Sequence, residues 1–397
     1  MIPAVTPLDA RLADALAATP PRIPVVPGWC GSGRTDALLR LQSRLGADRC
    51  QYVDVERVAT TPERFFEALV APTPFRMPGH SELGAKVTSP RAGFDAVLVF
   101  LAGAQTADGL PATFLLDEAF ELRTFESFPG LRDTIPELLA AVADSPNRFV
   151  LTTRFATRAR RLVRSAPGRM VIVEGLGVSP AVITGLLASE GLAEHETDGL
   201  STTAVVHALT QGHAGYVREL LTALSQMARD GIVDPVGAFA SLLSRRGRLS
   251  ASCRFCYELR LHRARGYGAL KAILDVLAQE EPLTLSAVAQ RLARTPGSTK
   301  DYLTWLEDVD LVQAARKRYR ITDPLLKLWI RLYGRPCPPT DDDLAREIHR
   351  YASERLPLAR AAEAPAGSPM PPEPEPVSVP RRDRPAVDRS WGIIEID

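Results

Sequence analysis

Residues 23–35 read IPVVPGWCGSGRT and are the most informative part of this 397-residue chain. Two β-branched residues, Val25 and Val26, predict a short strand that leads into a glycine loop. Apolar residues at positions 37–39 then predict a helix. A strand, a glycine loop and a helix in this order aim backbone N–H groups and a helix N-terminus at phosphate. The sequence therefore predicts a nucleotide phosphate site; the alternative is a glycine loop without a ligand.

The loop follows the phosphate-binding spacing, with one departure at position 34. Thr35 is expected to offer its hydroxyl to Mg²⁺, and the side chain before it to reach the β- and γ-phosphates of ATP. That side chain is Arg34 where the pattern has Lys; it keeps the positive charge but is planar and bulkier. Nucleotide binding is thus predicted, and hydrolysis is left open. The predicted nucleotide-binding residues are Gly28, Gly31, Ser32, Gly33, Arg34, Thr35 and Asp36.

A second motif follows at residues 112–118, which read ATFLLDE. The apolar run predicts a buried parallel strand whose carboxyl end delivers two carboxylates to the same site. Asp117 is expected to hold Mg²⁺ together with Thr35, and Glu118 to polarise the attacking water. These patterns make Asp117 and Glu118 the predicted catalytic carboxylates.

Further strands are predicted near residues 51–55, 148–153 and 170–174, which gives an α/β core with a five-stranded parallel sheet. Arg154 follows the strand at 148–153; it either senses the γ-phosphate or is an exposed arginine at a strand end. A basic helix comes next. Its arginine face is either a contact surface between subunits or a charged face exposed to solvent. The arginines eligible to act across a subunit interface are Arg123, Arg132, Arg158, Arg160, Arg161 and Arg164.

The chain is helical from residue 179, which predicts a small helical lid. The turn at 212–215 opens one of its helices, with Arg218 one turn later; His207 and His213 are expected to be ordinary surface or core histidines.

Residues 267–321 then show three helices and two short strands around a basic turn, the order of a winged helix-turn-helix. Its predicted DNA-binding residues are Lys300, Arg316, Lys317, Arg318 and Arg320. Three acids on the same helix (Asp301, Glu307, Asp308) favour protein contacts instead, so both uses stay open.

The sequence divides into an ATPase core (1–176), a lid and connector (177–264), a winged helix (265–335) and a disordered Pro-rich tail (336–397). The tail ends in a hydrophobic peptide, Trp391 to Asp397, that either docks on a protein partner or folds back.

Composition limits the classes of protein that fit. Lys and Arg nearly balance Asp and Glu, with a net charge of +1, so any DNA surface must be local. Membrane-length apolar runs and a signal-peptide pattern are both missing, which predicts a cytoplasmic protein without a membrane partner. Five scattered cysteines favour a reducing compartment; Cys253 and Cys256 are structural thiols or, less simply, half of a zinc site.

Together these motifs resemble P-loop ATPases of the AAA+/STAND group, in the prokaryotic and archaeal-type branch that carries a C-terminal winged helix. The resemblance covers roughly residues 20–335 and includes LTTR at 151–154, similar to a STAND sensor, and DPLLKLW at 323–329. Ala214 replaces the proline of the family's Gly-x-Pro turn. The resemblance implies ATP-dependent conformational switching, often with assembly into a homo-oligomer.

Three functions follow from these expectations. The first is an ATP-dependent switch whose winged helix engages duplex DNA. The second is a signalling or assembly ATPase whose winged helix packs on its own nucleotide domain. The third is a protein that binds nucleotide without hydrolysing it, suggested by Arg34.

Overall fold

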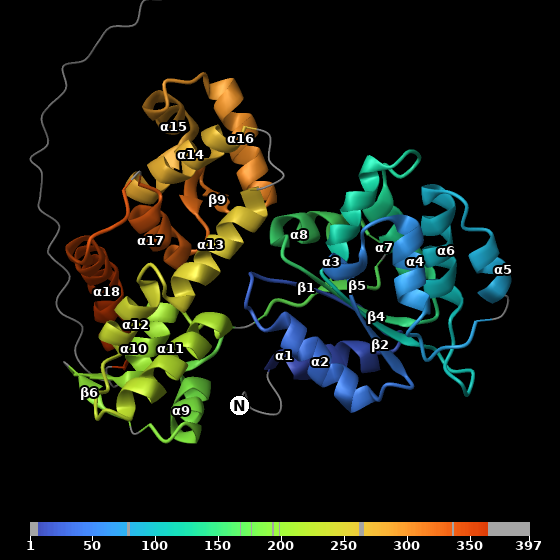
Figure 1. Ribbon diagram of the computed structural model, residues 1–397, viewed down its shortest axis with the longest axis horizontal. Helices are drawn as coiled ribbons and strands as arrows, with labels where there is room; N and C mark the ends of the chain where they lie inside the picture. The colour runs from blue at the N-terminus through green and yellow to red at the C-terminus, as the bar shows by residue number, and fades with distance from the viewer. Residues whose placement is uncertain are drawn as a thin grey trace, which may run out of the picture.

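The computed structural model describes residues 7–77, 80–166, 168–175, 177–192, 194–197, 199–261, 266–335 and 337–363. Figure 1 shows two halves side by side: a sheet flanked by the early helices, and a helical half that contains α9 to α18. Among the described helices, none is long and apolar enough to cross a lipid bilayer.

The first half is built on a five-stranded parallel sheet, as the sequence predicted. Its strand order is β2-β3-β4-β1-β5. Val25 pairs with Leu151 and Leu115 with Val150, so β1, β3 and β4 lie in the centre. The strands are β1 (Ile23–Pro27), β2 (Cys50–Asp54), β3 (Thr113–Asp117), β4 (Arg148–Thr153) and β5 (Met170–Ile172).

Helices cover both faces of this sheet because its central strands are apolar on both sides. Along β3, Leu115 packs with α1 and α2 on one face, and Phe114 and Leu116 pack into a larger core on the other. The first face is covered by α1 (Pro7–Ala17) and α2 (Arg34–Leu45). The second is covered by α3 (Val55–Val58), α4 (Pro62–Val70), α6 (Pro90–Gly103), η1 (Ala119–Ser127), α7 (Thr134–Asp144) and α8 (Ala156–Ser165). Within the segment expected to be irregular, the structure has a short helix, α5 (His80–Ala85).

The helical half begins after β5. It contains α9 (Pro180–Ser189), the small hairpin β6 (Glu196–Thr197) and β7 (Leu200–Ser201), then α10 (Thr202–Thr210), α11 (Ala214–Ala228), α12 (Pro235–Leu243) and α13 (Arg248–Leu261). Its hydrophobic core extends from Ile183 on α9 to Ala352 near the end of the described chain. The segments proposed as lid and as winged helix therefore share one core.

Residues 267–333 continue this core with helices and a small antiparallel sheet of order β8-β10-β9. The elements are α14 (Tyr267–Glu280), β8 (Leu283–Thr284), α15 (Leu285–Arg291), α16 (Pro296–Asp308), β9 (Val312–Ala315), β10 (Arg318–Ile321) and α17 (Pro324–Tyr333). The turn between β9 and β10 consists of Arg316 and Lys317, with φ of 50° and 62°. Left-handed conformations at both positions are typical of a tight hairpin turn.

The expectation of a disordered tail from residue 336 is wrong for its first part. Residues Asp341–Glu363 form a long helix, α18. Ile348, Tyr351 and Ala352 are buried in the core of the helical half, and the Tyr351 hydroxyl donates to the Leu209 carbonyl over 2.9 Å. These apolar residues recur at helical spacing and form a stripe along one side of the helix. In the sequence this stripe is obscured by the Arg and Glu residues that lie between them. The terminal peptide, residues 391–397, lies outside the described residues.

Candidate nucleotide site

The phosphate loop connects β1 to α2 at the carboxyl edge of the sheet. The Gly28 N–H donates to the Thr153 carbonyl over 3.0 Å, which joins the loop to the end of β4. Gly31 and Gly33 have φ of 75° and 82°, a region that side chains rarely adopt. A Cβ at Gly28 would lie 2.7 Å from the Ser32 Oγ. The backbone therefore favours glycine at Gly31 and Gly33, and a side chain at Gly28 would require Ser32 to move.

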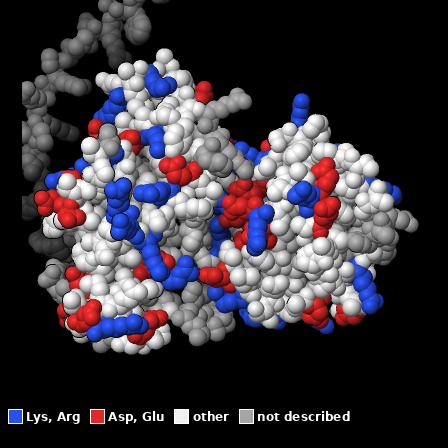
Figure 2. All heavy atoms as spheres, in the orientation of Figure 1, with Lys and Arg blue, Asp and Glu red and all other residues white. Residues whose placement is uncertain are grey.

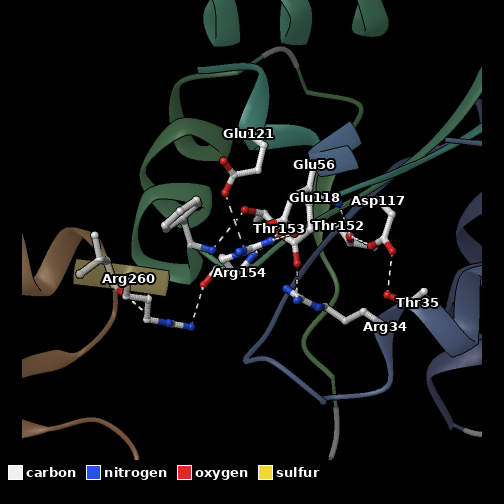
Figure 3. A network of polar contacts seen from close by, with 12 residues as sticks. Arg34, Thr35, Glu56, Asp117, Glu118, Glu121, Thr152, Thr153, Arg154 and Arg260 are labelled. Carbon is white, nitrogen blue, oxygen red and sulfur yellow. Dashed lines mark hydrogen bonds and ion pairs between the residues drawn. The ribbon is translucent and has the colours of Figure 1, made fainter. Parts of the chain in front are cut away.

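Thr35 and Asp117 meet at the base of this loop, as the two motifs predicted (Figure 3). The Thr35 hydroxyl donates to the Asp117 Oδ2 over 2.7 Å, and the Tyr52 hydroxyl donates to the same oxygen over 3.0 Å. Thr152 donates to the other carboxylate oxygen. Asp117 is 5% exposed, so its charge is held by three hydroxyl donors away from bulk water.

Glu118 follows directly and has a left-handed backbone, with φ of 53°. Its N–H donates to the Thr152 hydroxyl over 2.9 Å. One carboxylate oxygen accepts from Arg34 Nη2 over 2.6 Å, and the other accepts from the Arg154 N–H over 2.8 Å. The unusual backbone thus turns the carboxylate toward the phosphate loop; such local strain at a buried polar site is common where function constrains the chain.

Arg154 is 4% exposed, which excludes the alternative of a solvated arginine at a strand end. Its guanidinium is paired with Glu56 and lies 3.3 Å from Glu118 and 3.8 Å from Glu121. Burial lowers the pKa of Arg154, but the carboxylates of Glu118 and Glu56 outweigh it and raise the pKa. Arg154 is the positive centre of an acidic cluster.

The donor set fits a magnesium-bound nucleoside triphosphate. Among the described residues, buried polar atoms without a partner include the Ser32 Oγ and the Arg34 Nη1, both in the phosphate loop. Burying an unpaired donor is costly, so these atoms suit an anionic oxygen. Thr35 and Asp117 would supply oxygen ligands to Mg²⁺, and the loop backbone and Arg34 would hold the phosphates.

The start of α11 packs against the phosphate loop. A Cβ at Gly215 would lie 2.8 Å from the Gly31 carbonyl oxygen, so the two backbones are in close contact. His213 caps α11 and stacks on Tyr216; burial lowers the pKa of its imidazole, in keeping with the expected core role. Arg218 lies 3.6 Å from Asp36 at the start of α2. The helical half thus contacts the loop and the first turn after it.

A pocket of about 290 Å³ lies between η1 of the sheet half and α13 and α16 of the helical half. Figure 2 shows acidic side chains gathered where the two halves meet. The residues around the pocket include Glu56, Glu121, Arg154, Arg260 and Trp305. Arg260 is 3% exposed; its guanidinium donates to the Val309 carbonyl and lies 4.1 Å from the centre of the Trp29 ring.

Sequence reasoning missed several residues of this site. Tyr52 binds Asp117 together with Thr152, while Glu56, Glu121 and Arg260 surround Arg154. Thr152 belongs to the LTTR stretch already noted, whereas Tyr52 was overlooked; its position near the carboxyl end of a predicted strand was the available signal. Nothing local in the sequence marks the other three. Cys253 and Cys256 are both buried, and within the described part of the chain no three His, Cys, Asp or Glu side chains gather as metal ligands.

A parallel sheet with a phosphate loop after β1 and paired carboxylates after β3 defines a P-loop ATPase fold. The chain is similar in structure to the Walker-type ATPase PABY2304 of Pyrococcus abyssi. The TM-score is 0.55 at 15% identity, over 82% of this chain and 94% of that one. It also matches Aeropyrum pernix ORC1, solved in complex with DNA, with a TM-score of 0.42 at 17% identity, over 91% and 96% of the chains. No protein-family model and no curated protein matches the sequence.

Proposed function

We propose that this protein is an ATP-binding, ATP-hydrolysing switch of the AAA+/STAND type. The observation that carries the proposal is the 2.7 Å hydrogen bond between the Thr35 hydroxyl and Asp117 at the base of the phosphate loop, because both groups are oxygen donors of the kind that Mg²⁺ prefers. Glu118, the residue after Asp117, is the second carboxylate of the predicted pair. A cytoplasmic location and assembly on ATP binding belong to the same proposal.

In this mechanism Mg²⁺-ATP supplies the electrophilic phosphorus. Glu118 accepts a proton from the attacking water, and Arg34 places positive charge beside the phosphate oxygens. Both roles require the 2.6 Å Arg34–Glu118 pair to separate, because each side chain neutralises the other while they are joined. Arg154 holds the second oxygen of Glu118 and so orients it. The Arg34–Glu118 pair is therefore a resting contact that bound nucleotide would replace.

The direct test is an equilibrium titration with a fluorescent ATP analogue, with and without Mg²⁺. We expect saturable binding that weakens when Mg²⁺ is removed, because Thr35 and Asp117 would lose the ion they hold. The Thr35→Val variant should show little further loss on Mg²⁺ removal. Absence of binding to the wild-type protein would refute the proposal.

We further propose that residues 267–321 act as a winged helix that engages duplex DNA. Arg316, Lys317, Arg318 and Arg320 are exposed on the β9–β10 hairpin, and Lys300 is exposed on α16. Arginine and lysine at a hairpin tip are suited to phosphate contacts, which position a protein on DNA without reading its sequence.

Replacing Arg316, Lys317 and Arg318 by alanine should weaken DNA binding. Three lost phosphate contacts should reduce the slope of log K against log salt by about 2 to 3. Fluorescence anisotropy of a labelled duplex at several salt concentrations measures this slope. A matched control removes exposed Arg57 and Arg64 on the sheet half, and we expect its slope to be unchanged. An unchanged slope in the hairpin variant would exclude this surface.

A second function is favoured by a specific contact between the halves. Asp310, just after α16, accepts from the Thr157 N–H over 2.9 Å and from its hydroxyl over 2.6 Å, at the start of α8. Arg161 on α8 pairs with Asp308 over 3.2 Å. Under this alternative the winged helix packs on the nucleotide domain and restrains it, and the protein signals or assembles without binding DNA. ATP turnover that is indifferent to duplex DNA would favour it.

A further inference from the structure

Another pocket, of about 480 Å³, lies in the helical half and is lined by residues of β10, α17 and α18. Gln211 after α10, Glu281 after α14 and Gln313 on β9 complete its walls. Among the described residues that line it, none belongs to the predicted nucleotide site. The volume is within the range of about 300–1,000 Å³ that is typical of pockets for small molecules.

The walls of this pocket carry an excess of positive charge. The carboxylates that line it are Glu281, Glu347 and Glu354. Lys327 pairs with Glu281 over 3.0 Å, and Arg331 pairs with Glu347 over 2.8 Å. The cationic side chains outnumber these carboxylates by two, so the pocket does not neutralise itself. They are Arg320 on β10, Lys327 and Arg331 on α17, and Arg350 and Arg355 on α18.

Three donors on the walls of the pocket have no hydrogen-bond partner within the described part of the chain. They are the Thr322 hydroxyl, the Arg331 Nε and the Arg355 Nε. Arg331 is 7% exposed, and Glu347 accepts from its Nη2 over 3.0 Å. The Arg355 guanidinium lies 3.5 Å from the centre of the Tyr351 ring. Burying an unpaired donor costs free energy, so three of them around one pocket indicate an acceptor that belongs there.

We propose that this pocket binds a small molecule that carries a phosphate group and hydroxyl groups. A phosphate monoester has a charge of about −1.5 to −2 at neutral pH, which matches the two positive charges in excess. Its three terminal oxygens accept hydrogen bonds from several directions, as this site requires, because Thr322, Arg331 and Arg355 come from three different segments. The amides of Gln211 and Gln313 lie on the same walls and are suited to bind hydroxyl groups.

Isothermal titration calorimetry of the full-length protein with ribose 5-phosphate tests the site. We expect Thr322→Val to bind about 10- to 100-fold more weakly than the wild type, the usual loss for a hydrogen bond to a charged group. Valine keeps the shape and removes a hydroxyl that has no internal partner, so thermal denaturation should show no loss of stability. The matched control is Thr222→Val, because Thr222 is exposed on α11 and does not line the pocket. Its affinity should equal that of the wild type.

Arg34→Ala separates this pocket from the phosphate loop. We expect ribose 5-phosphate to bind Arg34→Ala as it binds the wild type, whether or not the loop binds ATP. Binding that is lost in Arg34→Ala and kept in Thr322→Val would place the phosphate in the loop and overturn the proposal. Equal affinity of Thr322→Val and the wild type, or no binding to the wild type, would overturn it as well.

Two further ligands test the chemical class. Citrate carries more charge on planar carboxylates, so we expect it to bind more weakly than ribose 5-phosphate; tighter binding would overturn the assignment to phosphate. A short DNA duplex should leave bound ribose 5-phosphate in place, because Arg331 is buried whereas a duplex contacts exposed side chains. Displacement by the duplex would instead make the pocket part of the DNA surface, with Arg320 common to both.

Discussion

Replacing Glu118 by glutamine should reduce ATP turnover about 100- to 10,000-fold while nucleotide still binds. Glutamine keeps the size of the side chain and one carbonyl acceptor but cannot take a proton from water; loss of a general base has effects of this size. The neutral side chain also weakens the 2.6 Å contact to Arg34, so affinity should not fall by the same factor. Steady-state phosphate release and a nucleotide titration separate the two effects.

The matched control for this variant is Glu126→Gln. Glu126 lies on η1, eight residues further along, and its contact is a 3.9 Å pair with Arg123. Its loss should leave turnover unchanged. Turnover by Glu118→Gln close to the wild-type rate would show that another group acts as the base. A wild-type protein without turnover would indicate that nucleotide binds without being hydrolysed, with Arg34 in place of Lys as the first cause to examine.

Replacing Arg154 by alanine should destabilise the protein by about 3 kcal/mol and also impair turnover. Removing one partner of a buried ion pair leaves uncompensated charge, which costs about 3–5 kcal/mol. The lower end applies because the Glu56 side chain is 43% exposed and can turn to water, whereas Glu118 and Glu121 are 12% and 14% exposed. Urea unfolding followed by circular dichroism measures the free energy.

Arg160→Ala is the control for charge removal alone. Arg160 lies on α8, and its side chain and that of its partner Glu174 are 46% and 47% exposed. An exposed pair of this kind contributes about 0–1 kcal/mol. Arg154→Lys would add a second comparison, since it keeps the charge but loses the planar fork. Equal stability of Arg154→Ala and Arg160→Ala would contradict the role of Arg154 as the centre of the acidic cluster.

Local patterns in the sequence were sufficient for the fold class and for the first residues of the site. The glycine spacing at 28–33 and the apolar strand before Asp117 are short-range signals, because the backbone conformation and the alternation of a strand are set by neighbours in the chain. Parallel strands then bring their carboxyl ends to one edge, which puts Thr35 and Asp117 on the same side of the sheet. Their contact also depends on the strand order, in which β4 alone lies between β1 and β3.

Other features depended on contacts between distant segments. The stripe of α18 was overlooked because its apolar residues are separated by charges, and only the surface left by α10 and α17 shows which face is buried. The predicted lid and winged helix share one core for the same reason, because burial is decided by which elements pack together.

The chain by itself therefore determined a phosphate loop, a five-stranded parallel sheet and the carboxylates Asp117 and Glu118. Tertiary structure decided that Arg34 is joined to Glu118 and that Arg154 lies among three glutamates. The physical reason is range. Backbone preference and periodicity act over a few residues, whereas ion pairs depend on the three-dimensional position of side chains that the sequence separates widely.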